Sequence, residues 1–225
     1  MTKVEEITKV VETILNQEVD EEETESRGHI LAVFFMAALE EGDDIMQDLA
    51  LMLGADIAKH GVGLLKNAIV KGDLERIDFL IKSGAKITAK DDWGNENWAI
   101  ELASDVGDNE VVMFLIENGV DVTANDNAAI KQASIRGHID TIELLLENGA
   151  DASAGLSEAA ENGLKEVVEF LIKNGADVTV NNNCAVKEAF LGRYKEIVEI
   201  LIKAGASFSW YNFLIKNSKK ENNFK

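Results

Sequence analysis

Few side chains in this 225-residue sequence could carry out catalysis. Its histidines, which could serve as general acids or bases, are His29, His60 and His138. His29 and His60 have no partner that sequence spacing would place nearby. Cys184 is the single cysteine, and a helix N-terminus could lower the pKa of its thiol and make it nucleophilic. We interpret Cys184 instead as a small residue that begins a helix.

Motifs for phosphate and metal binding are absent from the sequence. The glycines at positions 61 and 63 match neither GxxxxGK[ST] nor GxGxxG. No metal-ligand spacing occurs, and one cysteine allows neither an intramolecular disulfide nor a thiolate cluster for zinc. Asp and Glu pairs are frequent, but among 41 acidic residues their proximity carries little information. We therefore predict a protein that is not an enzyme and that needs no cofactor.

The net charge of −19 is distributed unevenly along the chain. Residues 1–60 carry 15 acidic and 4 basic side chains, whereas residues 181–225 carry 4 acidic and 8 basic ones. Direct binding to nucleic acid is disfavoured, because phosphate contacts need clustered Lys and Arg. A basic protein partner is favoured instead, although the acidity could serve only solubility.

The sequence also lacks signals for membrane insertion and secretion. No apolar run reaches the roughly 18 residues of a membrane span. The N-terminal segment carries acidic residues within its apolar pattern, unlike a secretory signal. We expect no membrane association and a cytoplasmic location, which is the host cytoplasm if the protein is viral or comes from a phage.

Two columns of small residues define an internal repeat. An apolar triplet, a few polar residues and a Gly-Ala-Asp-like motif recur, with the glycine at Gly54, Gly84, Gly119, Gly149, Gly175 and Gly205. Sixteen residues before these glycines stand Ala38, Ala68, Ala103, Ala133, Ala159 and Ala189. A second glycine follows the alanine by four residues in every copy except the last, where Arg193 replaces it. Each copy is predicted to form a short helix, a turn, a second helix and a loop, and neighbouring copies must stack to bury their apolar faces.

These features resemble the ankyrin repeat family, in a variant similar to the Asn-rich repeats of viral and bacterial ankyrin proteins. The resemblance covers about residues 29–208 and is clearest in 128–151 and 184–207, where Gly137-His138 matches the family's Gly-His pair. It implies a structural role for His138. The family's Thr-Pro-Leu-His start is absent; Asn97, Asn127 and Asn183 stand there, and Asn can cap a helix as Thr does.

The predicted fold is an all-α ankyrin-type helical solenoid with short or stunted β-hairpin loops and helical caps at both ends. The hairpin should be most stunted at 153–155 and longest at 91–96, because the glycine spacing is 26 residues at the former and 35 at the latter. Residues 1–28 are predicted to form an N-terminal capping helix and an acidic segment. Residues 29–208 form the repeats, and residues 209–225 a C-terminal cap and tail.

The resemblance implies that a partner binds the concave side, which consists of loop tips and the exposed faces of the first helices. On this basis the predicted partner-binding residues are Asp91, Asp92, Trp93, Asn95, Glu96, Glu101, Asp105, Asn125, Asp126, Lys131, Arg136, Glu158, Glu161, Asn182 and Lys187. Trp93, an aromatic residue on the longest loop, is a candidate anchor. The residue before the recurring alanine is polar in four copies. Either the inner groove of the solenoid is more hydrated than usual, or these residues lie exposed at the rim of the groove.

We therefore expect an acidic inhibitor or adaptor that masks a basic surface of a partner protein, of the kind found in phage or viral counter-defence and in toxin immunity. The alternative is a structural scaffold or homo-oligomer whose acidity serves only solubility.

Overall fold

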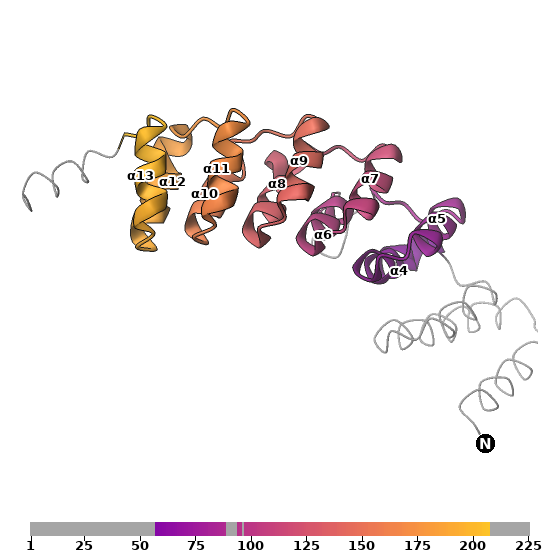
Figure 1. Cartoon of the computed structure of the whole chain (residues 1–225). Coiled ribbons are helices and arrows are strands. Elements are labelled where there is room, and N and C mark those ends of the chain that lie inside the picture. Colours follow the sequence, from indigo (N-terminus) through magenta and orange to yellow (C-terminus); the bar gives the residue numbers. More distant parts are fainter. Residues whose placement is uncertain (1–56, 89–93, 96, 208–225) are drawn as a thin grey trace, which may run out of the picture. The chain divides into compact units, whose positions relative to one another are not determined.

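A computed structural model of the chain describes residues 57–88, 94–95 and 97–207, and within these ranges it contains ten α-helices and no strand (Figure 1). The predicted capping helices and the first repeat copy lie outside the described residues. So do His29 and four predicted binding residues, Asp91, Asp92, Trp93 and Glu96.

Contacts between residues divide the chain into two compact units. The described part of the first unit consists of residues 57–67 and 75–86. It contains most of α4 (Ile57–Lys71) and of α5 (Leu74–Lys82), and its buried side chains include Leu64, Leu65, Ile77 and Leu80. The second unit contains the remaining described residues, and the candidate site lies within it.

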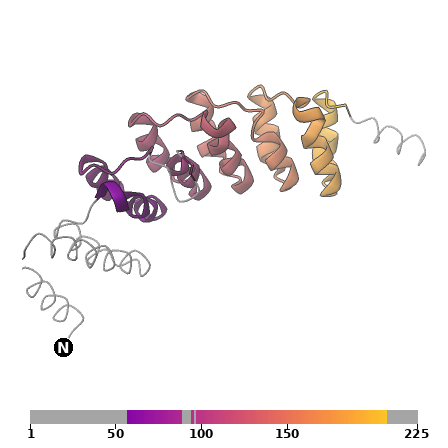
Figure 2. The same ribbon diagram turned by 180° about the vertical axis from the view of Figure 1, so that it is seen from behind.

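The second unit contains four helix pairs that lie side by side, as the two opposite views show (Figures 1 and 2). The pairs are α6 (Trp98–Val106) with α7 (Asn109–Glu117), α8 (Ala124–Arg136) with α9 (Ile139–Glu147), α10 (Leu156–Glu161) with α11 (Lys165–Lys173), and α12 (Val180–Leu191) with α13 (Lys195–Lys203). The first helices of successive pairs contact one another, from α6 through α8 and α10 to α12. The prediction of an all-α ankyrin-type solenoid is thus confirmed for the described repeats.

The alanine column forms the centre of this stack. Ala103, Ala133, Ala159 and Ala189 have no exposed surface, which is expected where two helices approach too closely for a larger side chain. The second helices contribute broad apolar faces, as in α11, where Val167, Val168 and Leu171 are buried. One pair alone would leave these faces in water, so the pairs are stable only when stacked.

The glycine between the two helices of a pair is required for two reasons. Gly107 and Gly137 have φ of 80° and 82°, in the left-handed region that favours glycine. A Cβ on Gly107 would also lie only 2.6 Å from the ring of His138, which packs over it from the next pair. In the last pair Arg193 adopts φ of 63° without the freedom of glycine, so this turn is strained.

Within the described residues the loops between pairs form tight turns and no strand, as expected of stunted hairpins. Most of the segment 91–96, which is predicted to form the longest hairpin, lies outside these residues.

Candidate partner-binding surface

The loops between helix pairs begin with an aspartate whose carboxylate accepts hydrogen bonds from the residue two positions later. The carboxylate of Asp121 accepts hydrogen bonds from the amide and the hydroxyl of Thr123, at 2.9 and 2.8 Å. Asp177 does the same with Thr179, at 2.8 and 2.7 Å. The hydroxyl bond, followed by the amide bond, lowers the pKa of each aspartate. This turn explains why Asp follows the exit glycine of the repeat.

After two of these loops, the first residues of α8 and α12 form a left-handed turn. The segments Asn125–Asp126–Asn127 and Asn181–Asn182–Asn183 have φ between 50° and 58° at every residue. Asn and Asp are the non-glycine residues that tolerate this region best, because their short polar side chains can form local hydrogen bonds. The Asn-rich composition of the loops is therefore a backbone requirement.

Side chains of these turns and of the short loop accept hydrogen bonds from the next loop along the chain. The amide oxygen of Asn127 accepts a hydrogen bond from the backbone N–H of Asp151 at 2.9 Å, and Asn183 accepts one from Ser207 at 2.7 Å. In the short loop, the hydroxyl oxygen of Ser153 accepts one from the N–H of Asp177 at 3.0 Å. Each bond spans 24 residues, and together they form an inter-repeat ladder.

This ladder corrects the expected role of the asparagines as helix caps. Asn97 makes no capping hydrogen bond through its side chain, and the oxygens of Asn127 and Asn183 accept from the following loop. Spacing within one repeat could not reveal this, because the donor belongs to another repeat.

Three of the predicted binding residues form one polar cluster. The amide nitrogen of Asn95 donates to Glu101 at 2.7 Å, and that of Asn125 donates to Glu101 at 2.9 Å and to Asn95 at 2.6 Å. The cluster joins the segment before α6 to the left-handed turn in the first residues of α8. Its polar atoms are largely engaged with one another, which holds this part of the surface in a fixed arrangement.

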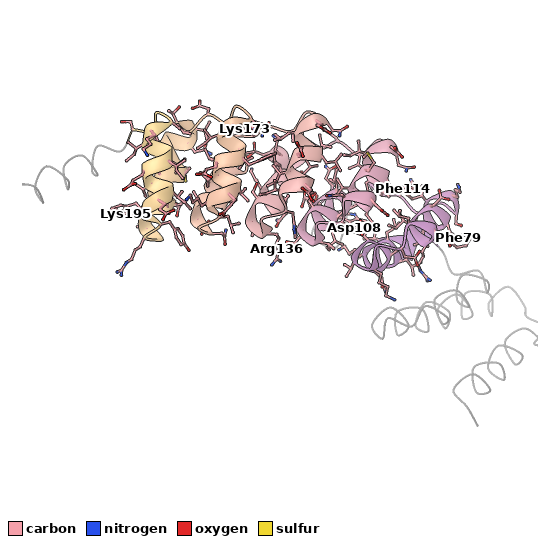
Figure 3. The ribbon with its side chains drawn as sticks, in the orientation of Figure 1. Phe79, Asp108, Phe114, Arg136, Lys173 and Lys195 are labelled. Carbon is pink, nitrogen blue, oxygen red and sulfur yellow. The ribbon has the colours of Figure 1, made fainter. Side chains whose placement is uncertain are left out.

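Four further predicted residues form two ion pairs. Lys131 contacts Asp126 at 2.6 Å, and its hydrogen bond lowers the pKa of that carboxyl. Arg136 makes a two-point contact with Asp105 at 2.7 and 3.1 Å, which links the C-terminal end of α8 to α6. Figure 3 shows Arg136 at the lower end of α8 and Lys195 at the same end of the stack, where α13 begins.

Glu158 differs from the other predicted binding residues in its surroundings. The side chain is half-buried on α10, and its Oε2 atom is buried without a hydrogen-bond partner among the described residues. Desolvation raises the pKa of this carboxyl, although a hydrogen bond from the backbone of Glu158 itself and then the positive charge of Lys131 oppose the shift. Glu161 and Asn182 are exposed, and Lys187 is half-buried.

Glu158 is one of the residues that line a polar recess of about 330 Å³. Its walls include the two left-handed turns and the short loop, with Asp126, Lys131, Asp151, Ser157, Glu158 and Cys184 among the lining residues. The loop is short because the spacing here is 26 residues, so the recess opens between the longer loops on either side. Sequence reasoning identified the short loop but missed the recess, whose signal is a shortened spacing between two Asn-rich segments.

The described His and Cys side chains, the types that could take part in catalysis, contact other residues of the fold. A ring nitrogen, Nε2, of His138 lies 3.1 Å from the backbone oxygen of Asp105, in accord with the structural role that the resemblance implied. The thiol of Cys184 contacts Glu188 Oε1 at 3.8 Å. His60 lies in α4, and its side chain is outside the described part of the structure. Within the described part of the chain, no group of three or more His, Cys, Asp and Glu side chains could hold a metal ion.

None of the described helices is long and apolar enough to cross a membrane.

Comparison with known families gives two matches. A family model of ankyrin repeats in three copies matches residues 65–155, and a model of a single ankyrin repeat matches residues 156–183. Together they cover 119 of the 225 residues, which is more than half of the chain. No curated protein matches the sequence significantly.

Proposed function

The chain belongs to the ankyrin repeat family, whose repeats mediate binding to other proteins, and on this basis we propose that it is a non-catalytic acidic inhibitor or adaptor that masks a basic surface of its partner. Ankyrin repeats indicate a protein–protein interaction module, and the charge of the surface supports the finer assignment.

The charge of the helix pairs carries this proposal. Residues 97–207 contain 19 acidic and 8 basic side chains, a net charge of −11. Half of those basic side chains lie in ion pairs with carboxylates of the same chain: Lys131 with Asp126, Arg136 with Asp105, Lys165 with Glu196 and Lys195 with Glu199. Little positive charge is therefore left to oppose the acidic residues, and a negative field of this kind attracts and orients a basic surface.

The negative sign of this net charge also disfavours direct binding to nucleic acid, which needs clustered cations. We place the protein in the cytoplasm, of the host if it is viral or comes from a phage, in keeping with its single cysteine. A counter-defence or toxin-immunity role is consistent with an acidic protein that occupies a basic surface used to handle nucleic acid.

Affinity capture from the native host tests the proposal. Proteins retained by the immobilised chain at about 0.1 M salt should be released at about 1 M, because salt screens exposed charge contacts. Glu161→Lys on α10 should weaken the capture, whereas the matched charge reversal Glu166→Lys on α11 should not, since both residues are exposed but they lie on different helices of one pair. Retention that is unchanged at 1 M salt, or equal loss in both variants, would contradict the proposal.

Self-association is the second candidate function, and the end of α12 favours it. Leu191 is 72% exposed, and it lines an apolar recess with Phe190 and Val198. Sedimentation at several protein concentrations distinguishes the candidates, because a stable self-associated species supports a scaffold.

A further inference from the structure

Four helix ends of the second unit carry a chemically labile dipeptide, Asn-Gly. In an unfolded chain the backbone nitrogen of the glycine attacks Cγ of the asparagine, and its proton leaves with the amide nitrogen as ammonia. The cyclic imide then takes up water and opens to aspartate or isoaspartate. Glycine favours this reaction because it has no Cβ to hinder its nitrogen. The dipeptides follow α7, α9, α10 and α11 and are Asn118-Gly119, Asn148-Gly149, Asn162-Gly163 and Asn174-Gly175.

All four asparagines are exposed to water, but their side chains are held against the helix that they follow. The amide nitrogen Nδ2 of each one donates a hydrogen bond to the backbone oxygen of the residue four positions earlier. The distance is 2.8 Å for Asn118, Asn148 and Asn162, and 2.9 Å for Asn174. The nitrogen that has to leave as ammonia is therefore engaged at every site, and Cγ is fixed beside the helix end.

The backbone at these helix ends holds the attacking nitrogen away from Cγ. The four asparagines have ψ between 1° and 20°. The planar imide requires the glycine nitrogen to eclipse Cβ of the asparagine. A ψ near zero eclipses it with the asparagine's own backbone nitrogen instead. Each glycine N–H also donates to the backbone oxygen three residues earlier, at 2.9 to 3.4 Å. The folded helix end thus blocks the ring closure in two ways.

The helix ends without asparagine show that this side chain is not needed for the turn itself. Ser83 precedes Gly84 after α5, and Ala204 precedes Gly205 after α13. The N–H groups of these two glycines donate to the backbone oxygen three residues earlier at 3.0 and 3.1 Å, as in the copies with asparagine. Serine or alanine can therefore replace asparagine without a change in the backbone.

We propose that the four Asn-Gly pairs are latent modification sites, which the folded helix ends keep unreacted and which hydrolyse to aspartate or isoaspartate when an end opens. The product cannot restore the closed end. A carboxylate has no hydrogen to donate to the helix carbonyl, and its charge meets the negative end of the helix dipole. Isoaspartate also lengthens the main chain by one methylene. A repeat that has opened and reacted should therefore open more easily afterwards. This inference is independent of the proposed partner.

Peptide mapping of the full chain by mass spectrometry tests the proposal. At mildly alkaline pH the folded chain should convert the four asparagines about tenfold or more slowly than the chain unfolded in urea, because hydrogen bonds at the helix end must break first. Leu145→Ala removes a fully buried side chain of α9 and should accelerate conversion of Asn148 without denaturant. Glu143→Ala, at an exposed position of the same helix, is the matched control and should leave the rate unchanged.

The stability of variants at one site gives a test that does not depend on reaction rates. Asn148→Asp reproduces one product, whereas Asn148→Ala removes the donor without adding charge. Urea denaturation at neutral pH should rank the parent chain above Asn148→Ala and Asn148→Ala above Asn148→Asp. The two variants should converge in acid, where the new carboxyl is neutral. Equal conversion rates in the folded and unfolded chains, or an Asn148→Asp variant as stable as the parent, would overturn the proposal.

Discussion

The pair α10–α11 buries residues at the same repeat positions as the pairs beside it, but the loops that precede the pairs differ. Leu156 of the short repeat occupies the same column as Ile130 and Val186, and none of the three has exposed surface. The segment that precedes α10, however, lacks the left-handed turn found in the first residues of α8 and α12, and α10 has 6 residues. The comparison shows that the columns maintain the stack, whereas loop length decides where the surface is hollow.

The largest expected effect concerns the close approach that the short loop imposes. Gly155 has φ of −87°, which any residue adopts, but a Cβ there would lie 2.2 Å from Oγ of Ser134. The same column holds alanine in the longer repeats, at Ala129 and Ala185, where it is buried without difficulty. Gly155→Ala should therefore lower the free energy of unfolding by about 1–3 kcal/mol, measured by urea denaturation.

A Ser134→Ala background is the control for this substitution. It removes the atom nearest to the added Cβ and should reduce the loss that Gly155→Ala causes. Equal stability of Gly155→Ala and the parent chain would mean that the short repeat does not pack more closely than its neighbours.

Removing hydrogen bonds of the inter-repeat ladder should cause the next loss of stability. Asn127→Ala removes a hydrogen bond and also places alanine at φ of 58°, which together should destabilise by about 1–3 kcal/mol. Ser153→Ala should lose only the hydrogen bond, about 0.5–1.5 kcal/mol, because Ser153 is not at positive φ.

Asn127→Gly separates the two contributions in the longer loop. Glycine accepts the left-handed conformation, so this variant should be more stable than Asn127→Ala in urea denaturation. If the two variants had the same stability, the left-handed turn would not be a source of strain.

The smallest effect is the pH dependence, and its sign should differ between the two kinds of repeat. The lowered pKa of Asp177 stabilises the fold above the ordinary value of 3.8, and this contribution is lost as pH falls through the folded-state pKa. Thr179→Val should therefore be less stable than the parent near neutral pH, and the difference should shrink in acid.

Glu158 should show the opposite dependence. Its raised pKa means that the ionised form destabilises the fold, so the penalty appears as pH rises from the ordinary value of 4.5 through the folded-state pKa. Glu158→Gln should be more stable than the parent above that pKa, with the difference fading in acid. Urea denaturation at a series of pH values measures both variants, and parallel curves for the two would contradict the assignment.

The fold was predictable from the sequence because its determinants repeat. In the described copies the alanine column marks close helix contacts and the glycine columns mark left-handed turns, with Arg193 in place of one glycine in the last copy. The columns also identify α12–α13 even though the family matches end at residue 183. A short repeat is also visible as a shortened spacing.

The chemistry of the surface was less predictable because its contacts join different repeats. Arg136 and Asp105 are 31 residues apart, and Asn127 and Asp151 are 24 apart. Sequence spacing within one copy gives no information on which side chains of two copies meet. For the same reason the asparagines were assigned as caps, and seven of the predicted binding residues turn out to contact one another within the chain. The unpaired oxygen of Glu158 depends on burial, which composition does not report.

The inter-repeat ladder has a consequence for how such a chain can grow. Every rung uses a side-chain oxygen at the end of one loop and a backbone N–H near the start of the next, so the donor is independent of residue type. A tandem duplication of one repeat would bring its own acceptor and would meet an existing donor at the new junction. Loss of one repeat would likewise leave matching ends. The stack could therefore gain or lose repeats by unequal recombination without a new kind of contact between repeats, and copies with divergent loops could accumulate along it.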